Sequence, residues 1–189
     1  MKTDALFQDL RNKNNIIVLE NTEDNIKKSF ENKYQHFKDK FFYEQFLNCG
    51  GFIIDNWIRI YGCGEINVIK KNELYNKNGT VDILIGEDVL GGLFALKDDI
   101  VFYFAPDTNE WEDLNTYYTQ FINWLINSPS DVHIFYQSYR WNTWKRDSEQ
   151  LKLNEGYSFY PLLQFDYDIE KRSRKIISID ELIRFHLGI

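Results

Sequence analysis

LFALKDDIVFYFA, residues 93–105, contains the two clearest strand signals in the chain. Residues 100–105 are apolar throughout, as expected of a strand that is buried on both faces. Residues 93–96 predict a second strand directly after the break at Gly91-Gly92. We predict that 100–105 is the most buried strand of the protein and that it lies between 93–96 and another antiparallel strand.

Further strand signals lie on both sides of this stretch. Residues 52–54 and 57–61 predict two strands separated by the turn Asp55-Asn56. Residues 81–85 alternate after Asn78-Gly79, a strong hairpin-turn pair. Residues 157–165 predict an edge strand, because Pro161 is tolerated better at an edge than in a central strand.

Helical periodicity precedes and follows the strands. In the first helix, capping residues at 21–24 precede Ile26, Phe30 and Tyr34 at helical spacing. The predicted helices are 21–34, 37–47, 117–125, 132–146 and 178–185. This order predicts an α+β fold, with a mostly antiparallel twisted sheet packed with helices at the N- and C-terminal ends. We expect a single domain over 1–189, with an N-terminal helical segment at 1–36 and the α+β body at 37–189.

The charge is concentrated in the middle of the chain. The net charge is −7, and residues 82–113 hold nine acidic residues against a single lysine. Such a block argues against nucleic acid, which needs a basic footprint, and suits a basic protein partner. Solvated loop residues are the alternative interpretation. The candidate partner-binding residues, predicted to share one exposed face, are Glu87, Asp88, Asp98, Asp99, Glu110 and Asp113.

The sequence contains no signal for a membrane or for export. No window approaches the ~18–20 apolar residues that a membrane span requires. Charged residues at positions 4, 9 and 11 occupy the place of the apolar run of a signal peptide. We therefore predict a cytoplasmic protein, in which Cys49 and Cys63 remain reduced.

Catalytic motifs are missing from the sequence. The three histidines are scattered, and we find no nucleophile elbow, phosphate-binding loop or zinc spacing. We predict no catalytic residues, no cofactor and no metal, and hence no enzyme. An alternative is a metal-dependent hydrolase, because Asp107, Glu110 and Glu112 crowd one turn after a buried strand. Arg59, within an apolar strand, must pair or reach the surface, and we predict a salt bridge to a loop carboxylate such as Asp55.

Several longer strings resemble an uncharacterised bacterial family of unknown function. They are CGGFIIDNWIRIYG at 49–62, DVLGGLFAL at 88–96, YFAPD at 103–107 and WE at 111–112, with FYP at 159–161. The resemblance implies a structural role for its motif residues. These are Gly50, Gly51, Asp55, Trp57, Arg59, Gly62, Gly91, Gly92, Phe94, Pro106, Asp107 and Trp111.

The same order of elements is similar to the broader SUKH superfamily, many of whose bacterial members are immunity proteins that neutralise secreted toxins. This similarity implies a SUKH-like α+β body and a non-catalytic protein-binding domain that inhibits a toxin. The expected partner is then a basic toxin domain. A housekeeping or regulatory interaction protein of the same fold is the alternative.

Overall fold

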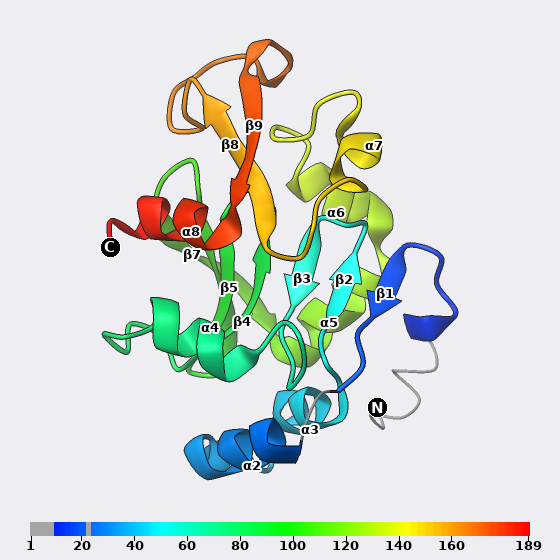
Figure 1. Cartoon of the computed structure of the whole chain (residues 1–189), viewed down its shortest axis with the longest axis vertical. Coiled ribbons are helices and arrows are strands. Elements are labelled where there is room, and N and C mark those ends of the chain that lie inside the picture. Colours follow the sequence, from blue (N-terminus) through cyan, green and yellow to red (C-terminus); the bar gives the residue numbers. More distant parts are fainter. Residues whose placement is uncertain (1–9, 22–23) are drawn as a thin grey trace.

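The computed structural model describes residues 10–21 and 24–189, which form two antiparallel sheets with helices packed around them (Figure 1). Thr22 and Glu23, two of the predicted capping residues, and the first nine residues lie outside the described part of the chain. Within the described part, no helix is long and apolar enough to cross a membrane.

The larger sheet has seven strands in the order of the sequence, so each strand pairs with the next one along the chain. Its strands are β1 (Ile16–Val18), β2 (Phe52–Ile54), β3 (Ile58–Ile60), β4 (Ile83–Asp88), β5 (Leu93–Lys97), β6 (Ile100–Ala105) and β7 (Glu110–Tyr117). A separate hairpin pairs β8 (Glu155–Tyr160) with β9 (Ser173–Ser178). The α+β fold and the antiparallel sheet are as predicted.

Seven helices complete the described part of the fold. They are α2 (Asp24–Lys33), α3 (Phe41–Asn48), α4 (Val68–Tyr75), α5 (Tyr118–Asn127), α6 (Pro129–Phe135), α7 (Trp144–Ser148) and α8 (Ile179–Leu187). Asn67 caps α4 by accepting hydrogen bonds from the N–H groups of Ile69 and Lys70. Gly188, with a φ of 69°, ends α8 in the left-handed conformation.

Aromatic side chains attach the helices to the sheet. The ring of Phe94 on β5 lies 5.0 Å from that of Phe121 on α5, and Tyr103 on β6 lies 5.3 Å from Phe135 on α6. In Figure 1, α5 lies behind the strands, and the β8–β9 hairpin projects beyond the main sheet. Tyr157 ties the hairpin to the sheet by donating its N–H to the carbonyl of Val89, just after β4.

The prediction that β6 is the most buried strand is wrong, because β4 is the longest strand in which every residue is buried. Every residue of β4 is buried, whereas Ile100 and Phe102 of β6 are only half-buried. The reason is position: β6 lies between β5 and β7, as predicted, but β7 is the exposed edge of the sheet. β4 is the middle strand of the sheet, three strands from that edge, and is therefore covered on both faces.

Other differences arise where short or polar elements depend on their neighbours. The N-terminal segment, predicted to be helical, contributes β1 to the sheet through pairing with β2. The predicted helix at 132–146 is divided between α6 and α7, with turns between them. The edge strand predicted at 157–165 is β8, which ends at Tyr160 before the cis bond to Pro161 and pairs with β9.

Phe104 offers a test of the packing of β6. Replacing Phe104 by Ala should lower the free energy of unfolding by about 3–5 kcal/mol, because the side chain is 5% exposed and packs on Trp111. Phe102→Ala should have a smaller effect, since Phe102 is only half-buried. Urea unfolding of the two variants gives the comparison, and equal losses would contradict this account of the strand.

Candidate functional site

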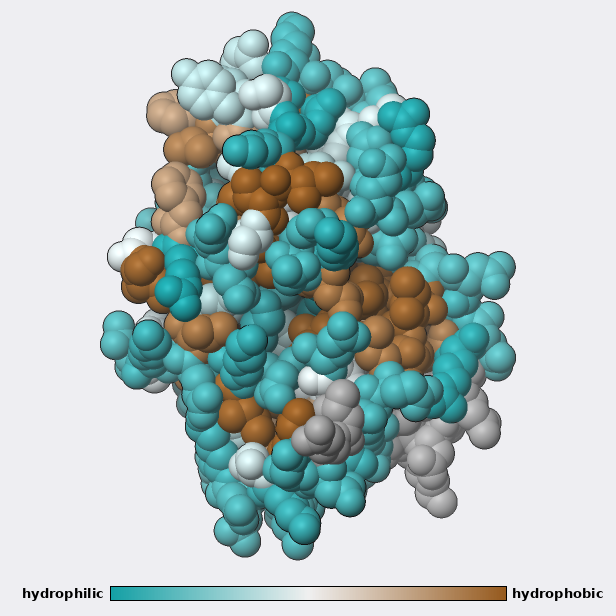
Figure 2. All heavy atoms as spheres, in the orientation of Figure 1, coloured by the Kyte–Doolittle hydropathy of each residue, from teal (hydrophilic) through white to brown (hydrophobic). Residues whose placement is uncertain are grey.

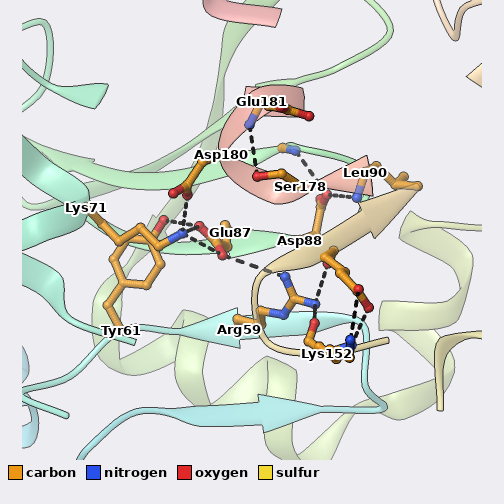
Figure 3. Close-up of polar contacts among 12 residues, drawn as sticks. Arg59, Tyr61, Lys71, Glu87, Asp88, Leu90, Lys152, Ser178, Asp180 and Glu181 are labelled. Carbon is orange, nitrogen blue, oxygen red and sulfur yellow. Dashed lines mark hydrogen bonds and ion pairs between the residues drawn. The ribbon is translucent and has the colours of Figure 1, made fainter. Parts of the chain in front are cut away.

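Four charged side chains meet between β3, β4, α4 and α8: Arg59, Lys71, Glu87 and Asp180 (Figure 3). We call them the buried charge cluster after its central pair, Arg59 and Glu87, which are buried, whereas Lys71 and Asp180 extend to the surface. The Nη1 atom of Arg59 lies 3.7 Å from Oε1 of Glu87. The Nζ atom of Lys71 lies 2.8 Å from Oε2 of Glu87 and 3.1 Å from Oδ1 of Asp180. Two cations face two carboxylates, so the formal charges of the cluster cancel.

Strand register places Arg59 directly opposite Glu87 across the β3–β4 ladder. Arg59 is 2% exposed, and its Nη2 donates to the carbonyls of Lys152 at 3.1 Å and Glu155 at 2.7 Å. Arg59 therefore links the main sheet to the start of β8. The predicted ion pair exists, but its carboxylate belongs to Glu87 on the neighbouring strand and not to the Asp55 loop. The reason is that strand pairing places Glu87 directly across from Arg59.

Tyrosines complete the hydrogen bonding of both carboxylates in the buried charge cluster. Tyr61 donates its hydroxyl to Oε2 of Glu87 at 2.8 Å, and Tyr75 donates to Oδ1 of Asp180. Burial raises the pKa of Tyr61 well above its usual value, so the phenol stays protonated as a donor. Burial alone would raise the pKa of Asp180, but the hydrogen bond from Tyr75 and the charge of Lys71 lower it below its usual range.

A surface pocket of about 400 Å³ opens beside Lys71. Its lining residues are Glu65, Ile66, Asn67, Lys70, Lys71, Leu74, Lys152, Leu153, Asn154 and Asp180. Lysines and carboxylates are mixed in this lining, and the ammonium of Lys71 already contacts two carboxylates. The pocket thus has no strong preference for an anion, and the buried charge cluster is best explained as a structural link.

Asp88 forms a second buried polar centre next to Glu87. It is fully buried, and its Oδ1 accepts the N–H groups of Leu90 at 2.8 Å and Gly92 at 3.0 Å. Its Oδ2 accepts the hydroxyls of Tyr103 at 2.6 Å and Tyr136 at 2.9 Å. Burial raises the pKa of Asp88, and the four hydrogen bonds oppose that rise. This carboxylate holds the β4–β5 turn and joins it to β6 and the end of α6.

The candidate partner-binding residues do not share one exposed face, and Glu87 and Asp88 are the clearest corrections. Both belong to β4, which is buried at every residue, and internal donors satisfy their carboxylates. Asp98 and Asp99 lie in the β5–β6 turn, and Oδ2 of Asp99 contacts Nζ of Lys40 at 2.6 Å. That turn and Glu110 lie at opposite ends of β6, roughly 20 Å apart by strand rise.

The side chains of Asp113 and Glu110 lie on opposite faces of the sheet, because side chains alternate between the faces along a strand. Asp113 pairs with Phe102, whereas Glu112 pairs with Tyr103, whose ring packs against α6. Glu110, two residues before Glu112, lies on the same face as Glu112. The strand therefore groups Glu110 with Glu112 and directs Asp113 to the other face.

We call Asp107, Glu110 and Glu112 the acidic edge. No ion pair to any of the three is found within the described residues, and Tyr139 donates its hydroxyl to Oδ2 of Asp107 at 2.5 Å. Burial raises the pKa of Glu112, and the charges of Asp107 and Glu110 raise it further. In the described part of the chain, no three His, Cys, Asp or Glu side chains are arranged to hold a metal ion. The carboxylates crowd without converging, so this geometry gives no support to the metal-dependent alternative.

Beside the acidic edge, the connection between β8 and β9 is built around one guanidinium. Arg172 is 6% exposed and donates to the carbonyls of Pro161, Leu162, Phe165 and Tyr167 at 2.5–3.0 Å. Gln164 donates to the carbonyl of Pro106 and to Oδ1 of Asn109, which fixes this connection against the β6–β7 turn. In the sequence, Arg172 is one of four basic residues at positions 171–175, and nothing local indicates this role.

We call residues 160–168 the aromatic loop, because Tyr160, Phe165 and Tyr167 are 76%, 62% and 46% exposed. Figure 2 shows separate hydrophobic areas on the face in view, between hydrophilic side chains. The predicted binding residues do not include this loop, although three aromatic residues within eight positions, next to a proline, are a usable sequence signal.

The residues implied by the family resemblance lie mostly in tightly packed positions. Trp57 is fully buried, with the rings of Trp141 and Tyr136 each 5.8 Å away. A Cβ atom on Gly62 would overlap the backbone of residues 49–51, and Gly91 has a φ of 85° in the turn that Asp88 holds. The other motif residues are placed as follows: Gly50, Gly51, Asp55 and Arg59 in or beside β2 and β3, Gly92 and Phe94 at β5, Pro106 and Asp107 in the β6–β7 turn, and Trp111 in β7.

Comparison with known proteins identifies the relatives of this chain. The model of the family described as "Protein of unknown function DUF2625" matches residues 5–182. The chain is 35% identical over 145 residues to "Putative uncharacterized protein YbfG" of Escherichia coli K12, which covers 70% of this chain and 66% of the relative. It is 30% identical over 149 residues to an uncharacterised protein of Haemophilus influenzae, covering 69% of this chain and 64% of the relative. The chain thus spans slightly less than two thirds of each relative. The predicted resemblance to an uncharacterised bacterial family is confirmed: this chain belongs to the DUF2625 family of proteins of unknown function.

Proposed function

We propose that this chain is a non-catalytic binding domain for a protein partner that has a basic surface. The observation that carries the proposal is the position of the aromatic loop, which is held by Arg172 and fastened by Gln164 beside the acidic edge. The loop that carries the exposed aromatic side chains is thereby fastened to the turn between Asp107 and Glu110 of the acidic edge.

The aromatic loop has the properties of a preformed contact surface. Aromatic side chains supply much of the binding energy at protein interfaces. Ordering a loop on binding weakens affinity, but the four carbonyl contacts of Arg172 already fix the backbone of this one. Phe165 and Tyr167 can therefore meet a partner with little further loss of backbone freedom.

The acidic edge indicates the charge expected on the partner's surface. Burial raises the pKa of Glu112, and the neighbouring charges of Asp107 and Glu110 raise it further because they repel its carboxylate. A partner that brings lysines or arginines would relieve this repulsion and would be steered toward the site during diffusion. The acidic edge thus favours a basic partner over an acidic one.

The thiols support a non-catalytic role in a reducing compartment. Burial raises the pKa of Cys49 to about 11 and that of Cys63 to about 12, so neither is a thiolate near neutral pH. Both side chains are buried, as expected of structural thiols in the cytoplasm. A cytoplasmic location is therefore part of the proposal.

Immunity against a toxin is the specific form that the SUKH resemblance suggests, with a basic toxin domain as the partner. A housekeeping or regulatory interaction protein is the alternative form. Capture of partners from lysate of the native organism separates them: a secreted toxin domain among the partners favours immunity, and a resident cellular protein favours regulation.

The acidic edge can be tested once a partner is captured. The double variant Glu110→Lys/Glu112→Lys should slow association about tenfold at low salt and much less at 0.5 M salt, because screening removes steering. Thermal stability should hardly change, since both side chains are exposed. Stopped-flow or surface-based association rates provide the measurement.

The matched control is Asp39→Lys/Asp98→Lys, which makes the same charge change at two exposed positions outside the acidic edge. If it slows association as much as the acidic-edge variant, the effect comes from net charge, and the acidic edge is not the binding surface. Rates that are unchanged in both variants would also reject the proposed surface.

A further inference from the structure

A pocket of about 530 Å³ lies at the junction of β7, α5 and α6. Its lining residues are Leu114, Thr116, Gln120, Phe121, Trp124 and Phe135. Three of them are aromatic and touch in series, with ring centroids 6.0 Å apart for Phe121 and Trp124 and 5.6 Å apart for Trp124 and Phe135. The wall is thus suited to a flat or bulky apolar group.

A bulge in β7 shapes one side of this pocket. Asp113 pairs with Phe102, but the next matched pair is Tyr117 with Ile100, so β7 carries two more residues than β6 over this interval. Oδ1 of Asp113 accepts the N–H of Asn115, whose φ is 50°, and this turn releases Leu114 and Thr116 from the ladder. The bulge and the charges also disfavour pairing of a foreign strand along β7. The pocket is therefore suited to an inserted side chain.

All charged residues of β7, which forms one wall of the pocket, are acidic. No lysine or arginine is among the lining residues. Glu112 is two residues before Leu114, and its cross-strand partner Tyr103 packs against Phe135 of the pocket wall. The acidic edge thus continues along the same strand and sheet face toward the rim of the pocket.

We infer that this pocket receives one large apolar side chain, aromatic by preference, from a partner segment whose neighbouring residues are lysine or arginine. The apolar side chain contacts the rings of Trp124 and Phe135, and the flanking cations contact Glu112 and Glu110. The inference rests on the proposed function for its biological partner, but the chemistry of the pocket can be tested without that partner.

Short capped peptides serve as probes: Lys-Lys-Trp-Lys-Lys, Glu-Glu-Trp-Glu-Glu and Lys-Lys-Ala-Lys-Lys. Titration of the isotopically labelled protein should move the indole N–H signal of Trp124 with the first peptide. The second and third peptides should bind at least about tenfold more weakly. The second carries negative charges in place of positive ones, and the third has no aromatic side chain to enter the pocket. This comparison uses the unaltered protein, so it does not depend on the folding of any variant.

A pair of variants locates the binding. Thr116→Trp places a large side chain in the pocket and should abolish the shift of the Trp124 signal. Thr119→Trp makes the same substitution at an exposed position of α5 outside the pocket lining and should leave binding intact. Equal binding of the two tryptophan peptides, or equal loss in both variants, would overturn the inference.

The captured partner distinguishes this inference from the proposed function. If Thr116→Trp weakens its binding about tenfold or more and Thr119→Trp does not, the pocket is the anchor site. If only the charge reversals in the acidic edge weaken binding, the inference fails and the proposed function stands. A concentration-dependent dimer that Thr116→Trp dissociates would identify a second copy as the occupant and would also overturn the inference.

Discussion

Replacing Arg59 by Ala should lower the free energy of unfolding by about 3–5 kcal/mol, the range expected when one partner of a buried ion pair is removed. The substitution would leave Glu87, which is fully buried, with Lys71 as its remaining cation. It would also deprive the carbonyls of Lys152 and Glu155 of their common donor. Chemical unfolding at neutral pH provides the measurement.

The loss should be specific to the guanidinium and to its pairing with Glu87. Lys152→Ala is the matched control, because its exposed side chain lies in the same region while its carbonyl remains available to Arg59. We expect little change in that variant. The double variant Arg59→Met/Glu87→Gln should be less destabilised than the sum of its single variants, since removing both charges leaves neither unpaired. Additive losses would show that the two side chains act independently.

The strands predicted from sequence are those with an apolar pattern of their own. β4, β5 and β6 combine that pattern with glycine or aspartate breaks, and the structure places them side by side in the sheet. β7 was missed because Glu110-Trp111-Glu112-Asp113 lies at a solvated edge, where no apolar alternation is required. β1 and β9 gain their regular hydrogen bonds from β2 and β8, and such pairing is not visible in a local window.

The candidate site was harder to predict, because acidic residues close in sequence have different surroundings. Asp88 and Glu112 belong to the same acidic block, yet one is buried among tyrosines and the other lies on an exposed edge strand. The position of each strand in the sheet decides whether its carboxylates are buried or exposed. The number of acidic residues in a stretch of sequence does not reveal that position. The grouping of Asp107, Glu110 and Glu112 was the better signal, because a single turn and strand bring these residues together without help from distant segments.

Asp88 leads to the second large expected effect. Asp88→Ala should lower the free energy of unfolding by about 3–5 kcal/mol, because four donors lose their acceptor in a fully buried place and each unmade hydrogen bond there costs about 1–3 kcal/mol before relaxation. Asp39→Ala, at an exposed position, is the control and should change little. A small loss in Asp88→Ala would mean that the β4–β5 turn is held by other contacts.

Asp88→Asn separates the hydrogen bonding of this side chain from its ionisation. Since burial raises the pKa of Asp88 in the folded protein, the folded state holds the proton more tightly than the unfolded state does. The stability that this proton contributes is complete below the unfolded pKa, near 3.8, and is lost as the pH rises through the higher folded pKa. The free energy of unfolding of the native protein minus that of Asp88→Asn should therefore decrease from acid toward neutral pH, because titrations at the other carboxyl groups cancel in the difference. Urea unfolding of both proteins at several pH values from about 4 to 7 measures this trend. A difference that increases with pH would mean that the hydrogen bonds from Tyr103 and Tyr136 outweigh burial and favour the ionised carboxylate.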